Sequence, residues 1–174
     1  GRGMNRLSKI ECLLCLGRIK DITRSKTHLE FVDALRQHGA SPKEDMHALW
    51  RRIILNILIF NTDDHLRNHG FLYGGPDGWR LAPAYDLNPV PTDIKPRVLT
   101  TAIDLDDGTA SLDLAMSVAG YFELDEAEAC AIAAEVGRAV QGWRKEAVRL
   151  GLTPAEINRM ASAFEHDDLK AALL

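Results

Sequence analysis

The feature that most constrains the fold is a long apolar stripe that ends abruptly in a polar run. Apolar residues recur at three-and-four spacing from Met46 to Leu58, which predicts a helix with one buried face. Residues 41–44 read Ser-Pro-Lys-Glu, a capping-box sequence with proline at the first helical position, so the helix should begin there. We therefore expect a core helix that presents the following polar segment, residues 61–68, from a rigid base.

The polar segment has the composition of a phosphoryl-transfer loop. Residues 61–68 read Asn-Thr-Asp-Asp-His-Leu-Arg-Asn. Kinases use a catalytic-loop aspartate, an asparagine five residues later and a second aspartate further on, and here these are Asp63, Asn68 and Asp86. Taken singly, such residues are also what any turn or helix cap between a helix and a strand would use. The whole run, combined with residues 79–86, favours the chemical interpretation.

Two stretches together resemble a known family. Residues 61–68, an apolar strand, and then Trp-Arg-Leu-Ala-Pro-Ala-Tyr-Asp at residues 79–86 resemble the C-terminal lobe of HipA-like serine/threonine kinases, which include bacterial toxins of type II toxin–antitoxin pairs. The resemblance runs from Leu29 to the C-terminus. It implies a mainly α fold (α+β): a kinase-like C-terminal helical lobe with a small β-hairpin that carries the metal-binding loop. Residues 1–28 remain an N-terminal segment of uncertain assignment, and residues 29–174 form the lobe.

The resemblance also implies roles for individual residues. Asp63 would orient or deprotonate the acceptor hydroxyl, and Asn68 and Asp86 would hold Mg²⁺, a hard cation that prefers oxygen ligands. His65 and Arg67, together with Asn68, would contact the phosphates of ATP, although a histidine in such a loop is more often a structural hydrogen-bonding residue. The acceptor would be a protein hydroxyl, and in the family the substrates include the translation machinery.

The neighbouring residues are expected to support the loop. Asp64 departs from the small residue expected at its position, which is harmless if its side chain points outward. Asn61 should brace the loop rather than contact substrate. Tyr85 and Pro83 should be packing residues that set the direction of Asp86.

The rest of the chain is expected to be helical apart from one hairpin and one irregular segment. Strands at 71–73 and 79–81, joined by a glycine-rich turn, form the hairpin, which should return Asp86 towards Asp63. Residues 88–110 contain prolines without clear periodicity and predict a loop. The expected helices cover residues 7–20, 28–38 with a stop at Gly39, 111–119, one long helix over 125–150, and a last helix from a capping box at Thr153 through Phe164 with further turns beyond Asp167.

Composition narrows the class of protein. The chain has 174 residues, enough for one domain or one lobe, and its net charge of −4 argues against a protein that coats nucleic acid or an anionic membrane. No signal peptide or membrane-spanning stretch is visible, so we expect a cytoplasmic protein without direct nucleic-acid or membrane binding. The three cysteines suggest no disulfide framework, and Cys12 and Cys15 form a lone C-x-x-C with little sign of a metal or redox site.

Parts of a complete kinase are missing from the sequence. Residues 1–60 contain no glycine-rich phosphate loop and no strand lysine in a Val-Ala-Ile context. The chain is therefore either a lobe of a larger kinase or a shortened relative, and alone it should transfer phosphate poorly.

Two alternatives from other classes remain open. The first is a non-catalytic binding module that partners a DNA-binding antitoxin in transcriptional repression, through the helix at 125–150 and the acidic residues 123–128. The second is a metal-dependent phosphohydrolase built on Asp63, Asp64, His65 and His69, residue types that bind metals.

Overall fold

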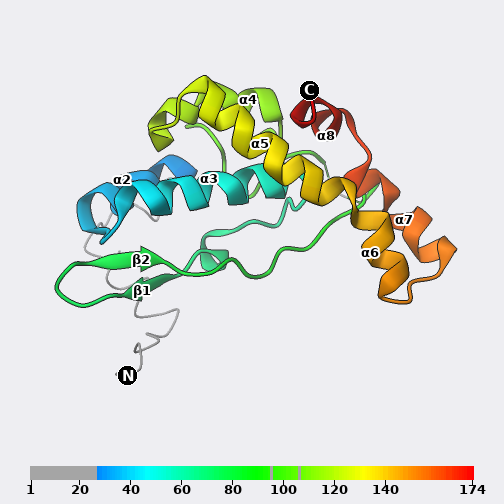
Figure 1. The fold of residues 1–174 in the computed structure, drawn as a ribbon, viewed down its shortest axis with the longest axis horizontal. Coiled ribbons are helices and arrows are strands. Elements are labelled where there is room, and N and C mark those ends of the chain that lie inside the picture. Colours follow the sequence, from blue (N-terminus) through cyan, green and yellow to red (C-terminus); the bar gives the residue numbers. More distant parts are fainter. Residues whose placement is uncertain (1–26, 95, 106) are drawn as a thin grey trace.

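The computed structural model of the chain describes residues 27–94, 96–105 and 107–174. The expected helix at 7–20 and the pair Cys12 and Cys15 lie outside these residues. Within them the fold is mainly helical with one small antiparallel sheet of two strands, as the sequence predicts (Figure 1). No helix in this part of the chain is both long enough and apolar enough to cross a membrane.

The elements occur in the expected order. They are α2 (His28–His38), α3 (Pro42–Leu58), the 3₁₀ turn η1 (Leu66–Asn68), β1 (Phe71–Tyr73), β2 (Trp79–Leu81), α4 (Leu112–Ser117), the 3₁₀ turn η2 (Ala119–Phe122), α5 (Glu126–Gln141), α6 (Trp143–Arg149), α7 (Pro154–Phe164) and α8 (Asp167–Ala172).

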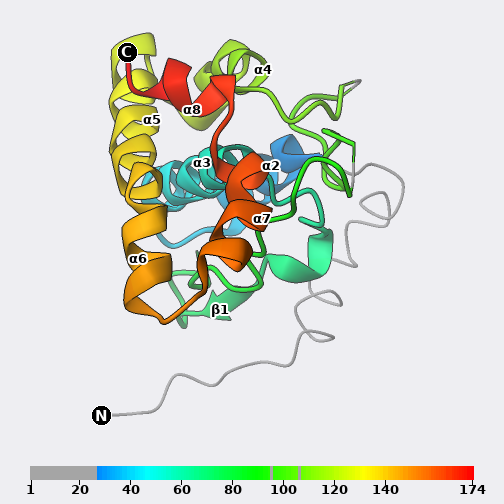
Figure 2. The ribbon, with the colours of Figure 1, turned by 90° about the vertical axis from the view of Figure 1, so that its right-hand side faces the viewer.

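Helix α3 is the centre of the fold. Its apolar stripe, from Met46 to Leu58, is buried as predicted, and the Trp50 ring packs against Phe122 at 5.2 Å between centroids. The hairpin lies along one side of α3, and α5 crosses it on the other side (Figures 1 and 2). Since α3 is covered on both sides, its C-terminal end is held rigidly where the polar loop begins.

The helix starts only partly follow the capping signals. α3 begins at Pro42 as predicted, but the Ser41 side chain makes no capping hydrogen bond. The backbone of Ser41 (φ −144°, ψ 70°) differs from the extended conformation that Thr153 adopts before α7, so the predicted capping box at residues 41–44 is wrong. The box at Thr153 is confirmed, with Glu156 as its reciprocal partner.

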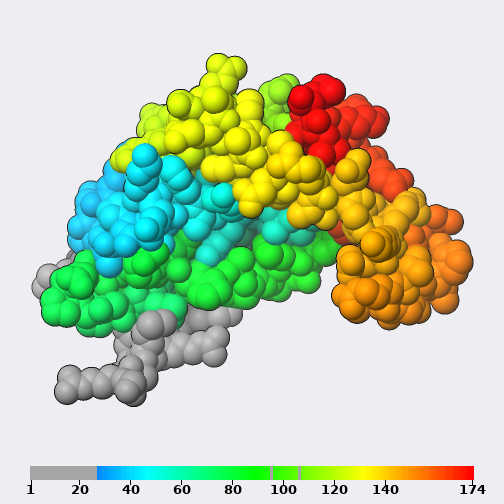
Figure 3. Space-filling view, viewed as in Figure 1, coloured from blue at the N-terminus to red at the C-terminus, as the bar shows by residue number. Residues whose placement is uncertain are grey.

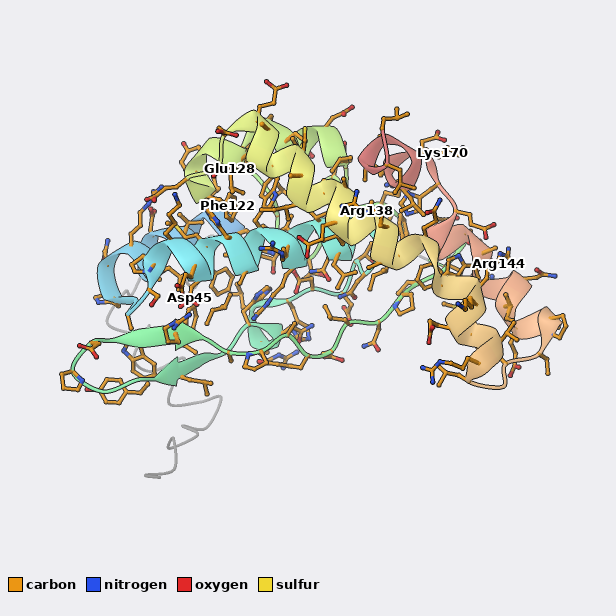
Figure 4. All side chains as sticks on the ribbon, viewed as in Figure 1. Asp45, Phe122, Glu128, Arg138, Arg144 and Lys170 are labelled. Carbon is orange, nitrogen blue, oxygen red and sulfur yellow. The ribbon has the colours of Figure 1, made fainter. Side chains whose placement is uncertain are left out.

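The long helix predicted over residues 125–150 is two helices. α5 ends at Gln141 and α6 starts at Trp143, with Gly142 between them. Glycine is a poor helix former, and a bend here lets the Trp143 ring stack on Phe164 of α7, 4.5 Å between centroids. Arg144, labelled in Figure 4, pairs with Glu165. α6 and α7 therefore form a pair that projects from the body of the molecule (Figure 3).

The hairpin is anchored to α3 by one buried carboxylate. Asp45 points from α3 towards the hairpin (Figure 4) and accepts hydrogen bonds from Nε of Arg80, at 3.0 and 3.1 Å, and from the backbone N–H of Leu81 at 3.0 Å. The strands pair as predicted, with Phe71 opposite Leu81. Asp45 thereby fixes where β2, and the segment after it, leave the hairpin.

A second buried carboxylate ties the C-terminus to the irregular segment. Asp168 of α8 pairs with Arg97 and accepts the backbone N–H of Leu112 at 2.8 Å. Burial by itself raises the pKa of the Asp168 carboxyl, but hydrogen bonds from His166 and Leu112 and the charge of Arg97 outweigh it and lower the pKa to about 2. Asp168 is therefore ionised at neutral pH and holds these segments together.

Candidate phosphoryl-transfer site

The polar loop leaves α3 through a tight, buried turn. Phe60 adopts a left-handed backbone (φ 57°) with its side chain fully buried. The Asn61 side chain donates to Oδ1 of Asn56 at 3.0 Å, and the Asn61 backbone N–H donates to the Asn56 carbonyl at 2.8 Å. Asn61 thus braces the loop from inside, as predicted from the sequence.

A hydrogen bond between Asn68 and Asp63 closes the loop. Asp63 is exposed, whereas Asn68 at the end of η1 is buried. The Asn68 side-chain amide donates to the Asp63 backbone carbonyl at 3.2 Å. This bond uses the amide nitrogen, so the side-chain oxygen is the atom that a cation would take. The two residues are not one helical turn apart, and the irregular loop is what brings them together.

The segment that carries Asp86 runs beside the loop. The Ala82 backbone N–H donates to the Gly70 carbonyl at 2.8 Å, and the Tyr85 hydroxyl donates to the Arg67 carbonyl at 2.7 Å. The residue before Asp86 is therefore bonded to the residue before Asn68, in keeping with the expected return of the hairpin.

Asp86 itself has a strained backbone. Its φ is 60°, in the left-handed region that non-glycine residues seldom adopt, and its side chain is exposed and accepts a hydrogen bond from Asn88 at 2.8 Å. Such strain is concentrated at functional sites. Tyr85 does support this residue, but Pro83 is exposed and does not pack as expected.

Asp64 differs most from expectation. It does not point outward: it is 2% exposed, and its two oxygens accept from His28 Nε2 at 3.0 Å and His69 Nε2 at 2.9 Å. Burial alone would raise the pKa of this carboxyl, but the hydrogen bonds and charges of the two histidines outweigh it and hold the pKa well below its usual range. Asp64 is therefore an ionised, buried residue behind the loop.

Sequence reasoning missed His28. It lies at the start of α2, 36 positions from Asp64, and no local pattern connects the two. In the parts of the chain that the structure describes, His28, Asp64 and His69 are the one group of three or more residues with metal-binding side chains close together. Asp63 and His65 do not belong to it, so the set proposed for a phosphohydrolase does not assemble as expected.

His65 and Arg67 line a surface hollow of about 230 Å³ beside the loop. Its other walls come from the segment predicted as irregular, because the backbone N–H of Thr100 donates to the Thr62 carbonyl at 3.1 Å and that of Thr101 donates to the Asp64 carbonyl at 3.0 Å. Nδ1 of His65 is buried without a hydrogen-bond partner among the described residues. The lining consists of His65, Leu66, Arg67, Thr100 and Thr101, so Asn68, the third residue expected to contact phosphate, is not in it.

The residues present fit a hard cation and a phosphate group. Asn68 and Asp86 supply oxygen atoms, the donors that Mg²⁺ prefers. Arg67 supplies an exposed positive charge in the same loop. By their chemistry, Asn68 and Asp86 could hold Mg²⁺ and Arg67 could contact phosphate, with the Asp63 carboxylate as the candidate proton acceptor.

Comparison with known proteins decides the family. The model of the HipA-like C-terminal domain matches residues 6–143, most of the chain. The chain belongs to the HipA-like C-terminal domain family. The resemblance noted from the sequence begins at Leu29, whereas the family match begins further upstream, at residue 6.

A solved structure has the same fold. It is HipA in the complex of the Shewanella oneidensis MR-1 toxin–antitoxin system HipA, HipB and its operator DNA, with a TM-score of 0.66 and 20% sequence identity. The match covers 90% of this chain and 37% of that HipA chain, so this HipA-like domain spans little more than a third of its solved relative. No curated protein matches the chain.

Proposed function

We propose that this HipA-like domain is the catalytic lobe of a protein serine/threonine kinase that transfers the γ-phosphoryl group of Mg–ATP to a protein hydroxyl. The observation that carries the proposal is the closed loop between Asp63 and Asn68, with the segment of Asp86 bonded alongside it through Tyr85 and Arg67. Two residues with metal-type oxygen donors, Asn68 and Asp86, and one candidate base, Asp63, thereby lie in two segments that are hydrogen-bonded to each other after the core helix α3.

Each residue of the loop has a role in this proposal. Asp63, exposed at the start of the closed loop, orients the acceptor hydroxyl and accepts its proton. Asn68 and Asp86 hold Mg²⁺, which neutralises charge on the phosphate oxygens when bound. Arg67 and His65 line the hollow where the phosphates would lie.

The lobe needs further parts for efficient transfer. A kinase covers the phosphates with a glycine-rich loop and contacts them with a strand lysine, and neither is recognisable in residues 1–60. The 174-residue chain alone should therefore bind the cation but transfer phosphate slowly. Rapid ATP-dependent phosphorylation by this chain alone would contradict the need for these further parts.

The direct test is cation binding. Mn²⁺, which is paramagnetic and takes oxygen ligands like Mg²⁺, is titrated into the chain and the free ion is measured by electron paramagnetic resonance. Asp86→Asn should weaken binding at least about tenfold, the loss of about 1.4 kcal/mol. The exposed Asp113 on α4 provides a matched control, since Asp113→Asn removes the same charge outside the loop. Equal loss in both variants would refute the metal site.

The catalytic role of Asp63 needs a protein that contains this lobe together with the missing kinase parts. In that protein Asp63→Asn should abolish transfer of ³²P from ATP to protein while Mn²⁺ binding is retained. Retained transfer would mean that another residue accepts the proton.

A second function is association with a small DNA-binding antitoxin. The observation that favours it is the solved relative, a HipA in complex with HipB and operator DNA. The partner would not use the apolar face of α5, because Ala129, Ile132 and Val140 already pack against the chain's own helices. Capture of a DNA-binding protein by the tagged chain from its source cells, with retained capture by Asp63→Asn, would support this function.

A further inference from the structure

The buried carboxylate of Asp64 bridges two histidines directly behind the loop. Its Oδ1 accepts from His69 at 2.9 Å and its Oδ2 from His28 at 3.0 Å. Asp64 follows Asp63 in the chain, and His69 follows Asn68. The bridge between Asp64 and His69 therefore spans the same five-residue interval as the bond from Asn68 to the Asp63 carbonyl. Together the two interactions fix both ends of the loop.

His28 connects this bridge to the rest of the fold. Its Nδ1 lies 3.0 Å from the Ala102 carbonyl oxygen, and its backbone N–H donates to the same oxygen at 2.9 Å. The two nitrogens of the His28 ring thus face two acceptors, the Ala102 carbonyl oxygen and the Asp64 carboxylate. The His28 ring thereby links helix α2, the loop and the segment at Ala102.

Because the cluster is buried, the Asp64 carboxylate depends on its hydrogen bonds to His28 and His69 for stabilisation. His28 is 0% exposed, and the His69 ring packs on Phe31 at 4.7 Å between centroids. A buried carboxylate without its donors costs several kcal/mol. The loop therefore cannot move away from His28 and His69 without exposing or orphaning the Asp64 charge.

The distances favour direct hydrogen bonds over a shared metal ion. Two ligands on one tetrahedral zinc ion, at about 2.0 to 2.1 Å each, lie about 3.3 Å apart. The separations of 2.9 and 3.0 Å are those of charge-assisted N–H···O bonds. The cluster as it stands leaves no need for an ion.

We propose that Asp64, held by His28 and His69, is a positioning residue that sets the separation and orientation of Asp63 and Asn68 without touching substrate or cation. The inference rests on the proposed function for the meaning of the loop, but the geometry it predicts can be measured independently. Loss of either donor should loosen residues 61–70 and weaken cation binding there, although neither histidine is a ligand.

Glutamine and asparagine separate the two ring nitrogens of a histidine. Glutamine places its N–H₂ near the position of Nε2, and asparagine places it near Nδ1. His28→Gln therefore keeps the donor to Asp64 and loses that to Ala102, while His28→Asn does the reverse. His69→Gln keeps the donor to Asp64, and His69→Leu removes it at similar size.

The experiment combines amide hydrogen exchange of the loop with Mn²⁺ affinity. His28→Asn and His69→Leu should speed exchange of residues 61–70 about tenfold or more and weaken Mn²⁺ binding about as much, the effect of losing a hydrogen bond to a charged group. His28→Gln and His69→Gln should stay within about threefold of the wild type. Ile132→Ala, a cavity on α5 outside the site, controls for a general loss of stability.

Each outcome decides the inference. Unchanged loop exchange in His69→Leu, or equal effects of the glutamine and leucine variants, would overturn it. One zinc ion per purified chain, lost in His69→Leu, would overturn the hydrogen-bond account and make the cluster a metal site. If the wild type and Asp86→Asn bind Mn²⁺ alike, the proposed function fails, whereas loosened exchange in the donor-less variants still supports the positioning role.

Discussion

Two glycines of the hairpin turn allow a matched test of how the hairpin is fixed to the helices. Gly75 and Gly78 both have positive φ, 100° and 112°. A Cβ at Gly75 would meet no atom within 4 Å, whereas a Cβ at Gly78 would lie 2.4 Å from the His38 carbonyl oxygen. The two alanine substitutions therefore share the backbone strain and differ in the clash.

The magnitudes follow from this difference. An alanine at positive φ costs about 1 to 2 kcal/mol, of which about 0.5 to 1 is offset by the less flexible unfolded chain, so Gly75→Ala should cost about 1 kcal/mol. Gly78→Ala must also move the strand from the His38 carbonyl and break the bond from the Ala40 N–H to the Trp79 carbonyl, 2.7 Å long. That adds about 2 kcal/mol.

Thermal unfolding followed by circular dichroism measures the effect. For a chain of this size, 1 kcal/mol corresponds to about 2 to 4 °C in Tm. Gly75→Ala should lower Tm by about 3 °C and Gly78→Ala by about 9 °C. Equal shifts in the two variants would refute the close packing of the hairpin on the turn between α2 and α3.

Three further predictions concern the other buried contacts. Asp45→Ala leaves the Leu81 N–H without its acceptor and should lower the free energy of unfolding by about 2 kcal/mol in urea titrations; a loss below about 0.5 kcal/mol would mean that water replaces the carboxylate. Asp168 has a pKa lowered to about 2 despite its burial, so its stabilisation is full above about pH 4 and is lost as the pH falls towards 2. The destabilisation by Asp168→Asn, about 1 kcal/mol at neutral pH after solvent screening, should therefore vanish at about pH 2, and a constant difference across that range would contradict the assignment. Even a Cβ at Gly137 would lie 3.3 Å from that of Ala172, so Gly137→Leu should release α8; faster hydrogen exchange of residues 167–174 with α3 unchanged would show this.

Local patterns were enough to predict much of the fold and the loop. The apolar spacing of α3, the glycine-rich turn of the hairpin and the capping box at Thr153 each act over a few residues, and each is confirmed. The order of Asp63, Asn68 and Asp86 is a sequence motif, and it was enough to point to the family that the comparison confirmed.

The features that the sequence did not predict depend on contacts between residues far apart in the chain. The break at Gly142 goes together with the stacking of Trp143 on Phe164, a contact between distant residues that helical periodicity does not reveal. The inward direction of Asp64 depends on His28, which nothing in the local sequence marks as its partner. Sequence patterns predict which segments form helices and which side chains carry chemistry, but not which buried charges find each other.

The left-handed backbone at Asp86 has an evolutionary consequence. Asparagine and glycine tolerate this conformation as well as aspartate does, whereas most other residues would strain it. Asp86→Asn would therefore remove the carboxylate and leave the backbone conformation unchanged. If Asp86 is the cation ligand that we propose, its carboxylate can therefore be lost in one substitution while the shape of the lobe is retained.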